Sequence, residues 1–450
     1  MSKNAKQKTD LKLAVIHPNS AAIDVGSMLM MVSYSDKEGN QCLLESDGFT
    51  DNLHKIAQTL TAAGVVRVAM EATGVYWMAL YEILESYGLE VTLVNPKHFK
   101  NVDAQKTDVK DCQWLHQLHA HGLLRASHIA PELSRELRSY LHERNILQNQ
   151  KSDVLNRIHR ILTKMNIKVQ HLISDIEGVS GMRLLNGISN GITNPEKLLS
   201  LINVKRLKAD KEDLLKSLKG DYKKQYISIL QNLLKQFIFF KDQMRSYELL
   251  IEEVLKHMLP WDEHGNKPEI KAKSTYVRKN EYSINLAQYL NHIAGVDLTR
   301  ITGLDEKTII EVIAVTGNDM TKWPSADHFT SWLNLSARPK ITGGKIIGFS
   351  KRFTNNPATQ AFRMAAQTLW HNKGPLGQTY RRLAAKKGSA KAIKAVARRL
   401  AVIFYNMVKN KTEFDPSKLI FDTEKQKAKK IKYLQAEAAK YGLILQKEAS

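Results

Sequence analysis

The sequence has few cysteines, no long apolar run and no secretory signal. Cys42 and Cys112 are the two cysteines among 450 residues, and they lie far apart. This argues against a disulfide framework or a thiolate zinc site. No stretch reaches the roughly 18 apolar residues of a membrane span, and the polar start, with Lys3, Lys6 and Lys8, is followed by no apolar signal segment. We therefore expect a cytoplasmic protein that contacts no membrane.

Acidic residues are also too few to balance the bases. The chain has 67 lysines and arginines against 45 aspartates and glutamates, a formal net charge of +22. Such a surplus favours polyanionic partners, nucleic acid above all, with an ordinary basic surface as the alternative. Because 450 residues exceed one compact core, two or three domains are expected.

The first 130 residues predict an alternating α/β domain. Strands are expected at 13–16, 22–26, 28–34, 41–45, 65–71 and 91–94, and helices at 53–63, 75–87 and 108–121. Strands that alternate with helices are typical of an α/β fold.

The rest of the chain predicts helices. Apolar residues recur at helical spacing in two long runs of 131–290, which indicates a helical arm or coiled coil for dimer contact, ending in a polar connector over 258–290. Residues 291–415 are expected to form a mostly helical domain, followed by a basic tail over 416–450. Within that domain, Ile301-Thr302-Gly303-Leu304 is typical of a helix–hairpin–helix turn that presents N–H groups to phosphate.

Four acids of the first domain stand at positions suited to metal ions. Asp24 is the only charged residue of the apolar stretch 21–26, where burial is costly without a partner. Glu71 ends an apolar strand. Asp108 and Asp111 are three residues apart at a helix start, which puts both carboxylates on one face near the positive end of the helix dipole.

Clustered carboxylates predict a site for Mg²⁺, which prefers oxygen ligands, and Mn²⁺ could substitute. Two ions about 4 Å apart would activate the attacking oxygen and stabilise the leaving one. The structural alternatives are an N-terminal capping role for Asp108, an ion pair for Asp111 and a turn-capping role for Glu71.

Basic residues and two glycines gather in the C-terminal domain. Glycines let a phosphate backbone approach closely, and lysines and arginines neutralise phosphates. The expected nucleic-acid contacts are Arg338, Lys340, Gly343, Gly344, Lys345, Lys351, Arg352, Arg363, Arg398 and Arg399. A solvated basic face is the alternative for any one of them.

Short motifs over nearly the whole chain carry a family resemblance. In the N-terminal part they are Ala22-Ile23-Asp24-Val25-Gly26, Met70-Glu71-Ala72-Thr73-Gly74-Val75-Tyr76, Leu93-Val94-Asn95-Pro96 and Lys106-Thr107-Asp108-Val109-Lys110-Asp111. In the C-terminal part they are Ile301-Thr302-Gly303-Leu304, Trp332-Leu333-Asn334-Leu335, Ile341-Thr342-Gly343-Gly344-Lys345 and Phe362-Arg363-Met364-Ala365-Ala366. Together they resemble the DEDD transposases of bacterial insertion sequences, relatives of the Piv-type DNA invertases.

The resemblance implies a RuvC-like, ribonuclease-H-like domain over 1–130 with the tetrad Asp24, Glu71, Asp108 and Asp111. It implies a helical arm for oligomerisation and a C-terminal transposase domain that supplies a serine nucleophile, the two domains forming a composite site across subunits of a dimer or tetramer. A structured non-coding bridge RNA would pair with donor and target DNA. The protein would then cut and rejoin DNA at the bacterial nucleoid.

One position departs from the family pattern. Aligned on Gly343-Gly344-Lys345, the family serine is replaced by Thr342. A threonine hydroxyl can act as a nucleophile, but its methyl group restricts χ1 and crowds an in-line attack. Thr342 is therefore a candidate nucleophile, an attenuated one or the mark of an inactive copy, with Ser336 and Ser350 as alternative hydroxyls. The other functions to weigh are a RuvC-like metal nuclease that uses water and an inactive copy that only binds nucleic acid.

Overall fold

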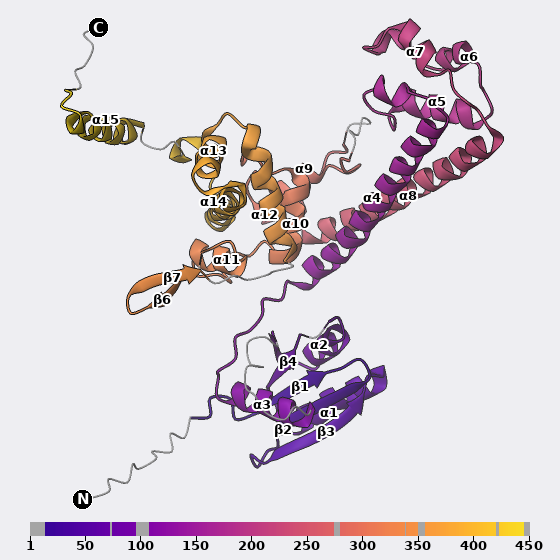
Figure 1. The fold of residues 1–450 in the computed structure, drawn as a ribbon. Helices are drawn as coiled ribbons and strands as arrows, with labels where there is room; N and C mark the ends of the chain where they lie inside the picture. The colour runs from indigo at the N-terminus through magenta and orange to yellow at the C-terminus, as the bar shows by residue number, and fades with distance from the viewer. Residues whose placement is uncertain are drawn as a thin grey trace, which may run out of the picture. The chain divides into compact units, whose positions relative to one another are not determined.

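The structure, a computed structural model, divides into two compact units, residues 1–129 and 130–450. It describes residues 14–72, 74–95, 108–273, 280–337, 339–349, 356–419 and 423–444 (Figure 1). No helix within these ranges is long and apolar enough to cross a membrane.

The N-terminal unit is built on a five-stranded mixed sheet of spatial order β3-β2-β1-β4-β5. Its strands are β1 (Ser20–Val25), β2 (Leu29–Ser35), β3 (Gln41–Asp47), β4 (Arg67–Glu71) and β5 (Glu90–Val94). The first three are antiparallel neighbours, and β4 and β5 run parallel to β1. The helices are α1 (Thr50–Ala62), α2 (Trp77–Ser86) and α3 (Asp108–Ala120). This confirms the ribonuclease-H-like α/β fold expected from the sequence.

Alternation along the strands directs side chains to two different faces of the sheet. Ala21 and Ile23 of β1 belong to the core that α1 and α2 cover. Ala22 and Ala69 point the other way and pack with Leu115 of α3. The helix α3 therefore covers the face opposite α1 and α2.

The start of this unit differs from the sequence prediction. In the described residues 14–16 the strand expected at 13–16 is not formed, and β1 begins at Ser20. Instead, the N–H groups of Ile16 and His17 both donate to the carbonyl of Ala120, at 2.8 and 2.9 Å. The segment satisfies its backbone polar groups at the end of α3, so it adds no sixth strand.

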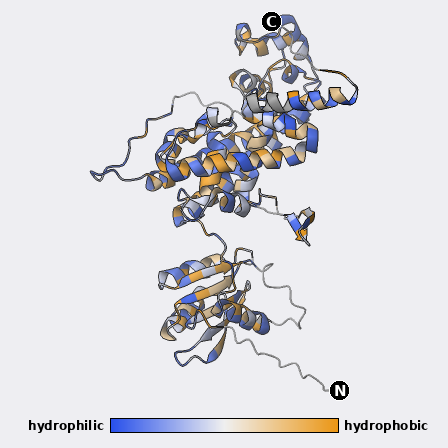
Figure 2. Ribbon diagram, turned by 90° about the vertical axis from the view of Figure 1, so that its left-hand side faces the viewer, coloured by the Kyte–Doolittle hydropathy of each residue, from blue (hydrophilic) through white to orange (hydrophobic). Residues whose placement is uncertain are grey.

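Two long helices open the second unit, α4 (Glu132–Lys164) and α8 (Lys224–Met258). They run antiparallel, because Arg144 contacts Glu248 and Arg157 contacts Gln236. The chain between them forms η2 (Val169–His171), α5 (Val179–Ser189), α6 (Pro195–Ser200), η3 (Val204–Arg206) and α7 (Lys211–Ser217). These pack with the adjoining ends of α4 and α8 around one apolar core. Hydrophobic and hydrophilic residues alternate along the helices, as amphipathic packing requires (Figure 2).

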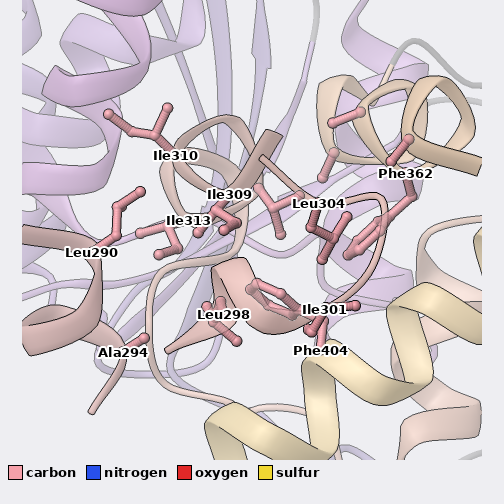
Figure 3. Packing of buried hydrophobic residues seen from close by; sticks show 14 of the residues in the cluster. Leu290, Ala294, Leu298, Ile301, Leu304, Ile309, Ile310, Ile313, Phe362 and Phe404 are labelled. Atoms are coloured by element: carbon pink, nitrogen blue, oxygen red, sulfur yellow. The ribbon is translucent and has the colours of Figure 1, made fainter. Parts of the chain in front are cut away.

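The other ends of α4 and α8 share a core with the C-terminal helices. Those elements are α9 (Leu286–Ala294), η4 (Leu298–Arg300), α10 (Glu306–Thr316), α11 (Ala326–Trp332), α12 (Pro357–Thr368), η5 (Leu369–His371), α13 (Pro375–Lys387) and α14 (Ser389–Asn410). Ile301 and Leu304, at the two ends of the expected helix–hairpin–helix turn, are buried in this core, and Figure 3 shows them near Phe404 and Phe362. Thr302, between them, is exposed. The described chain ends with η6 (Pro416–Leu419) and α15 (Thr423–Lys440).

A buried ion pair holds part of the expected polar connector in place. Arg144, only 1% exposed, donates from Nε to Glu248 Oε1 at 2.8 Å. The second oxygen of Glu248 accepts the N–H of Ser283 at 2.9 Å, and the guanidinium lies 3.9 Å from the ring centroid of Tyr282. Because each charge is compensated, the pair is tolerated inside the core. Tyr282 and Ile284 are consequently core residues rather than parts of a solvated linker.

Candidate active site

Two carboxylates lie side by side at the carboxyl ends of β1 and β4. The parallel register pairs Ala22 with Ala69, so two residues further along Asp24 stands beside Glu71. Alternation puts both acids on the face that α3 covers, the face of the two alanines. Glu71 is 4% exposed and Asp24 is half-buried. The sheet thus brings together two acids that are far apart in the sequence.

The first turns of α3 lie over the same end of the sheet. The Sγ atom of Cys112 is 3.3 Å from the carbonyl oxygen of Ala22 on β1 and 3.1 Å from a carbonyl oxygen of β2. Burial, reinforced by the negative charge of Asp24 nearby, raises the pKa of the Cys112 thiol to about 12. Asp111 directly precedes Cys112 and is half-buried. Asp111, the third acid, therefore belongs to the turn of α3 that lies next to Asp24.

The donor chemistry at this end of the sheet fits a hard divalent cation, although the described residues make up only part of a ligand set. Among the side chains that the structure describes, no three His, Cys, Asp or Glu groups could hold a metal ion together. The side chain of Asp108, at the start of α3, lies outside the described ones. A carboxylate as buried as Glu71 must be compensated by cations or hydrogen-bond donors, and carboxylate oxygens are ligands that Mg²⁺ takes.

The far end of α3 buries imidazoles instead of carboxylates. His116 and His119 are each 4% exposed. Nδ1 of His116 lies 3.0 Å from Ser33 Oγ, whereas Nε2 of each imidazole has no hydrogen-bond partner among the described residues. Burial lowers the pKa of both imidazoles, that of His119 to about 4 with a contribution from His17. These histidines are neutral packing groups near neutral pH.

The candidate nucleophile Thr342 lies in a two-stranded ribbon formed by β6 (Pro339–Thr342) and β7 (Lys345–Phe349) (Figure 1). The turn residues Gly343 and Gly344 have φ angles of +55° and +76°, values that favour glycine and suit a two-residue hairpin turn. Thr342 pairs with Lys345 directly across this turn. All residues of the ribbon except Gly348 are exposed. The segment that carries Thr342 is therefore a β-hairpin.

The alternative hydroxyls differ from Thr342. Ser336 is half-buried, and its Oγ lies 3.0 Å from Thr330 Oγ1, so it takes part in local packing. Ser350 lies outside the described residues, as do the expected contacts Arg338, Lys351 and Arg352.

The remaining expected nucleic-acid contacts lie on α12 and α14. Arg363 is exposed on α12. Arg398 of α14 donates to Asp327 Oδ1 at 2.6 Å in a half-exposed ion pair. Burial, with the neighbouring charge of Arg382, lowers the pKa of Arg399. Two guanidinium groups at close range strengthen the local positive potential.

Two family models match separate parts of the chain. A DEDD-type model of the IS110 kind, described as Transposase, matches residues 21–167. A second, described as Transposase IS116/IS110/IS902 family, matches residues 297–382. The first segment contains the four acids, and the second contains Thr342 and its ribbon. A search of curated proteins found no match to the chain.

Proposed function

Because the chain belongs to the IS110 family of DEDD transposases, a family that cleaves and transfers DNA strands, we propose that it does so with its four N-terminal acids and the hydroxyl of Thr342. The observation that carries this proposal is the register of β1 and β4. It sets Asp24 beside Glu71 on the face that α3 covers. An ordinary structural role would not require two carboxylates next to each other on a largely buried surface.

The acids would hold divalent metal. Asp24, Glu71, Asp108 and Asp111 are the proposed ligands of two Mg²⁺ ions, which Mn²⁺ could replace. Such ions stabilise negative charge on the attacking and leaving oxygens of a phosphoryl transfer. The fold contributes pre-organisation, because Asp24 and Glu71 project from paired strands that cannot move independently.

The reaction of Thr342 would conserve the energy of the broken phosphodiester bond in a covalent bond between protein and DNA. Oγ1 attacks the scissile phosphorus, an Oγ1–P bond forms, and the P–O bond to one deoxyribose oxygen breaks. The hydroxyl proton is lost to solvent, and the leaving oxygen takes up a proton to become a free hydroxyl. Rejoining reverses these steps with a hydroxyl from the other DNA.

The partners follow from the same proposal. Donor and target DNA would contact the ribbon and α12 and α14 through Lys340, Gly343, Gly344, Lys345, Arg363, Arg398 and Arg399, together with Arg338, Lys351 and Arg352. A structured bridge RNA would direct the choice of sites, and a homo-oligomer formed through the α4–α8 arm would assemble the site. Residues 1–130 would be the RuvC-like catalytic domain, 131–290 the arm and connector, 291–415 the nucleophile domain and 416–450 a basic tail.

A covalent-adduct assay tests the proposal. The full chain is incubated with Mg²⁺, RNA transcribed from its own element, and labelled donor and target DNA, and the products are separated on a denaturing gel. We expect Asp24→Asn to abolish cutting while DNA binding remains. Asp51→Asn, an exposed acid on α1 across the sheet, is the matched control and should cut normally.

The nucleophile is tested by Thr342→Ala and Thr342→Ser. We expect the adduct to vanish with alanine and to form faster with serine, because serine lacks the β-methyl group. Metal-dependent cutting without an adduct in any variant would indicate a water-using nuclease. A protein that binds DNA but never cuts it would be an inactive copy.

A further inference from the structure

The strand pairing of the β6–β7 ribbon places a lysine on either side of Thr342. Thr342 pairs with Lys345 across the hairpin, and paired residues of an antiparallel ribbon share a face, with Cβ atoms about 5 Å apart. Lys340 stands two residues before Thr342 on β6, and residues two apart on a strand also share a face. One face of the ribbon therefore carries Lys340, Thr342 and Lys345.

The opposite face of the ribbon is apolar. Ile341 pairs with Ile346, and Pro339 pairs with Phe349. The pairing skips Ile347, which forms a bulge in β7. This extra residue keeps Phe349 on the face of Ile346, although the two are three residues apart. The ribbon is thus two-sided, with its hydroxyl and both charges on one side.

Among the described residues, none compensates the positive charge of the polar face. No acid occurs between residues 339 and 349, and neither Lys340 nor Lys345 makes an ion pair with a described residue. Like charges on one face destabilise a two-stranded ribbon, which is marginally stable when isolated. An anion held between the two ammonium groups would remove this repulsion, and the hydroxyl between them is the proposed attacker of a phosphate.

We propose that Lys340 and Lys345 are catalytic residues that clamp the scissile phosphate, an inference that rests on Thr342 being the nucleophile. Each ammonium binds one non-bridging oxygen, so the phosphorus is held over Oγ1 for in-line attack. As Oγ1–P forms and the ester P–O bond breaks, negative charge builds on these oxygens. The lysines stabilise that charge. The lysines act electrostatically and exchange no proton with the substrate.

Single-turnover kinetics of the full chain at saturating protein separate this role from general DNA binding. The probe is the labelled duplex with the element's own end, with Mg²⁺ and the element's RNA. We expect Lys340→Gln and Lys345→Gln each to slow adduct formation about 10- to 100-fold, and Lys345→Arg to retain most of the rate. Lys219→Gln, an exposed lysine in the arm, removes the same charge and should react at the wild-type rate.

A second substrate makes the assignment specific. A methylphosphonate at the scissile position, mapped from the wild-type product, removes the negative charge that the clamp binds. The difference between wild type and Lys345→Gln should then shrink to less than about threefold, because the lysine has lost its partner.

The outcomes distinguish this inference from the proposed function. Wild-type single-turnover rates in both glutamine variants, while Thr342→Ala still abolishes the adduct, would overturn the clamp and leave the nucleophile standing. An undiminished glutamine defect on the methylphosphonate would also overturn it. If Thr342→Ala formed the adduct normally, or if the wild type formed none, both the clamp and the role of Thr342 as nucleophile would be refuted.

Discussion

Acid should weaken the N-terminal unit through the buried imidazoles under α3. His119 has a pKa of about 4 in the folded chain, lowered by burial from its ordinary value of 6.5. Between these values the unfolded chain binds a proton that the folded chain does not. The contribution of His119 to the free energy of unfolding is therefore fully present above pH 6.5 and is lost as the pH falls toward 4. Lowering the pH from 7.5 to 5 should cost about 2 kcal/mol from this group. The lowered pKa of His116 acts in the same direction.

Hydrogen exchange of the full chain measures this loss where it arises. The free energy of opening of the β1 amides, residues 20–25, is obtained by mass spectrometry at pH 7.5, 6 and 5 with correction for the intrinsic exchange rate. His119→Phe keeps a ring of similar breadth but cannot be protonated, so it should lose about 2 kcal/mol less than the wild type on acidification. His257→Phe, at an exposed position of α8, should behave as the wild type. Equal pH dependence of β1 opening in wild type and His119→Phe would refute the reasoning.

Two further predictions concern burial. Arg144→Leu leaves the carboxylate of Glu248 buried without its cation. It should lower the free energy of unfolding of the second unit, measured by chemical denaturation, by about 3–5 kcal/mol. The double variant Arg144→Leu/Glu248→Leu should recover much of the loss, and a double variant no more stable than the single one would contradict this reasoning. At pH 8 iodoacetamide should modify Cys42 in the native protein but Cys112 only after unfolding, because burial raises the pKa of the Cys112 thiol to about 12. Intact-mass measurement counts the labels. Two labels on the native chain would contradict the burial of Cys112.

The N-terminal fold could be predicted from the sequence because its strands and helices have clear periodicities. Asp24 stood out as a charge in an apolar strand, and β4 and β5 lie where short apolar runs indicated them. The strand expected at 13–16 was wrong in its described part, because local apolar character cannot reveal that Ile16 and His17 bond to the end of α3. Nor does spacing show that Asp24 and Glu71 stand side by side. That depends on the register of β1 against β4.

In the C-terminal part, local sequence patterns predicted less of the structure. No strands are predicted from the sequence around Gly343 and Gly344, although alternating residues on either side of a Gly-Gly pair are a hairpin signal. The bulge at Ile347 obscures that signal, because it breaks the alternation of β7. Likewise, the polar composition of 258–290 concealed the burial of Tyr282, which depends on an ion pair between two distant helices. Long-range pairing, rather than local preference, decides both cases.

The close approach of α3 to β1 depends on residues that bind no metal. Ala22 and Ala69 are fully buried beneath α3, and their methyl groups let the helix come so close that Cys112 Sγ reaches the carbonyl of Ala22 at 3.3 Å. A leucine at either alanine would overpack this contact and shift the helix. The acids of α3 would then move away from those of the strands. The spacing of the proposed ligands is therefore set two residues upstream of the strand acids, by side chains chosen for their small size.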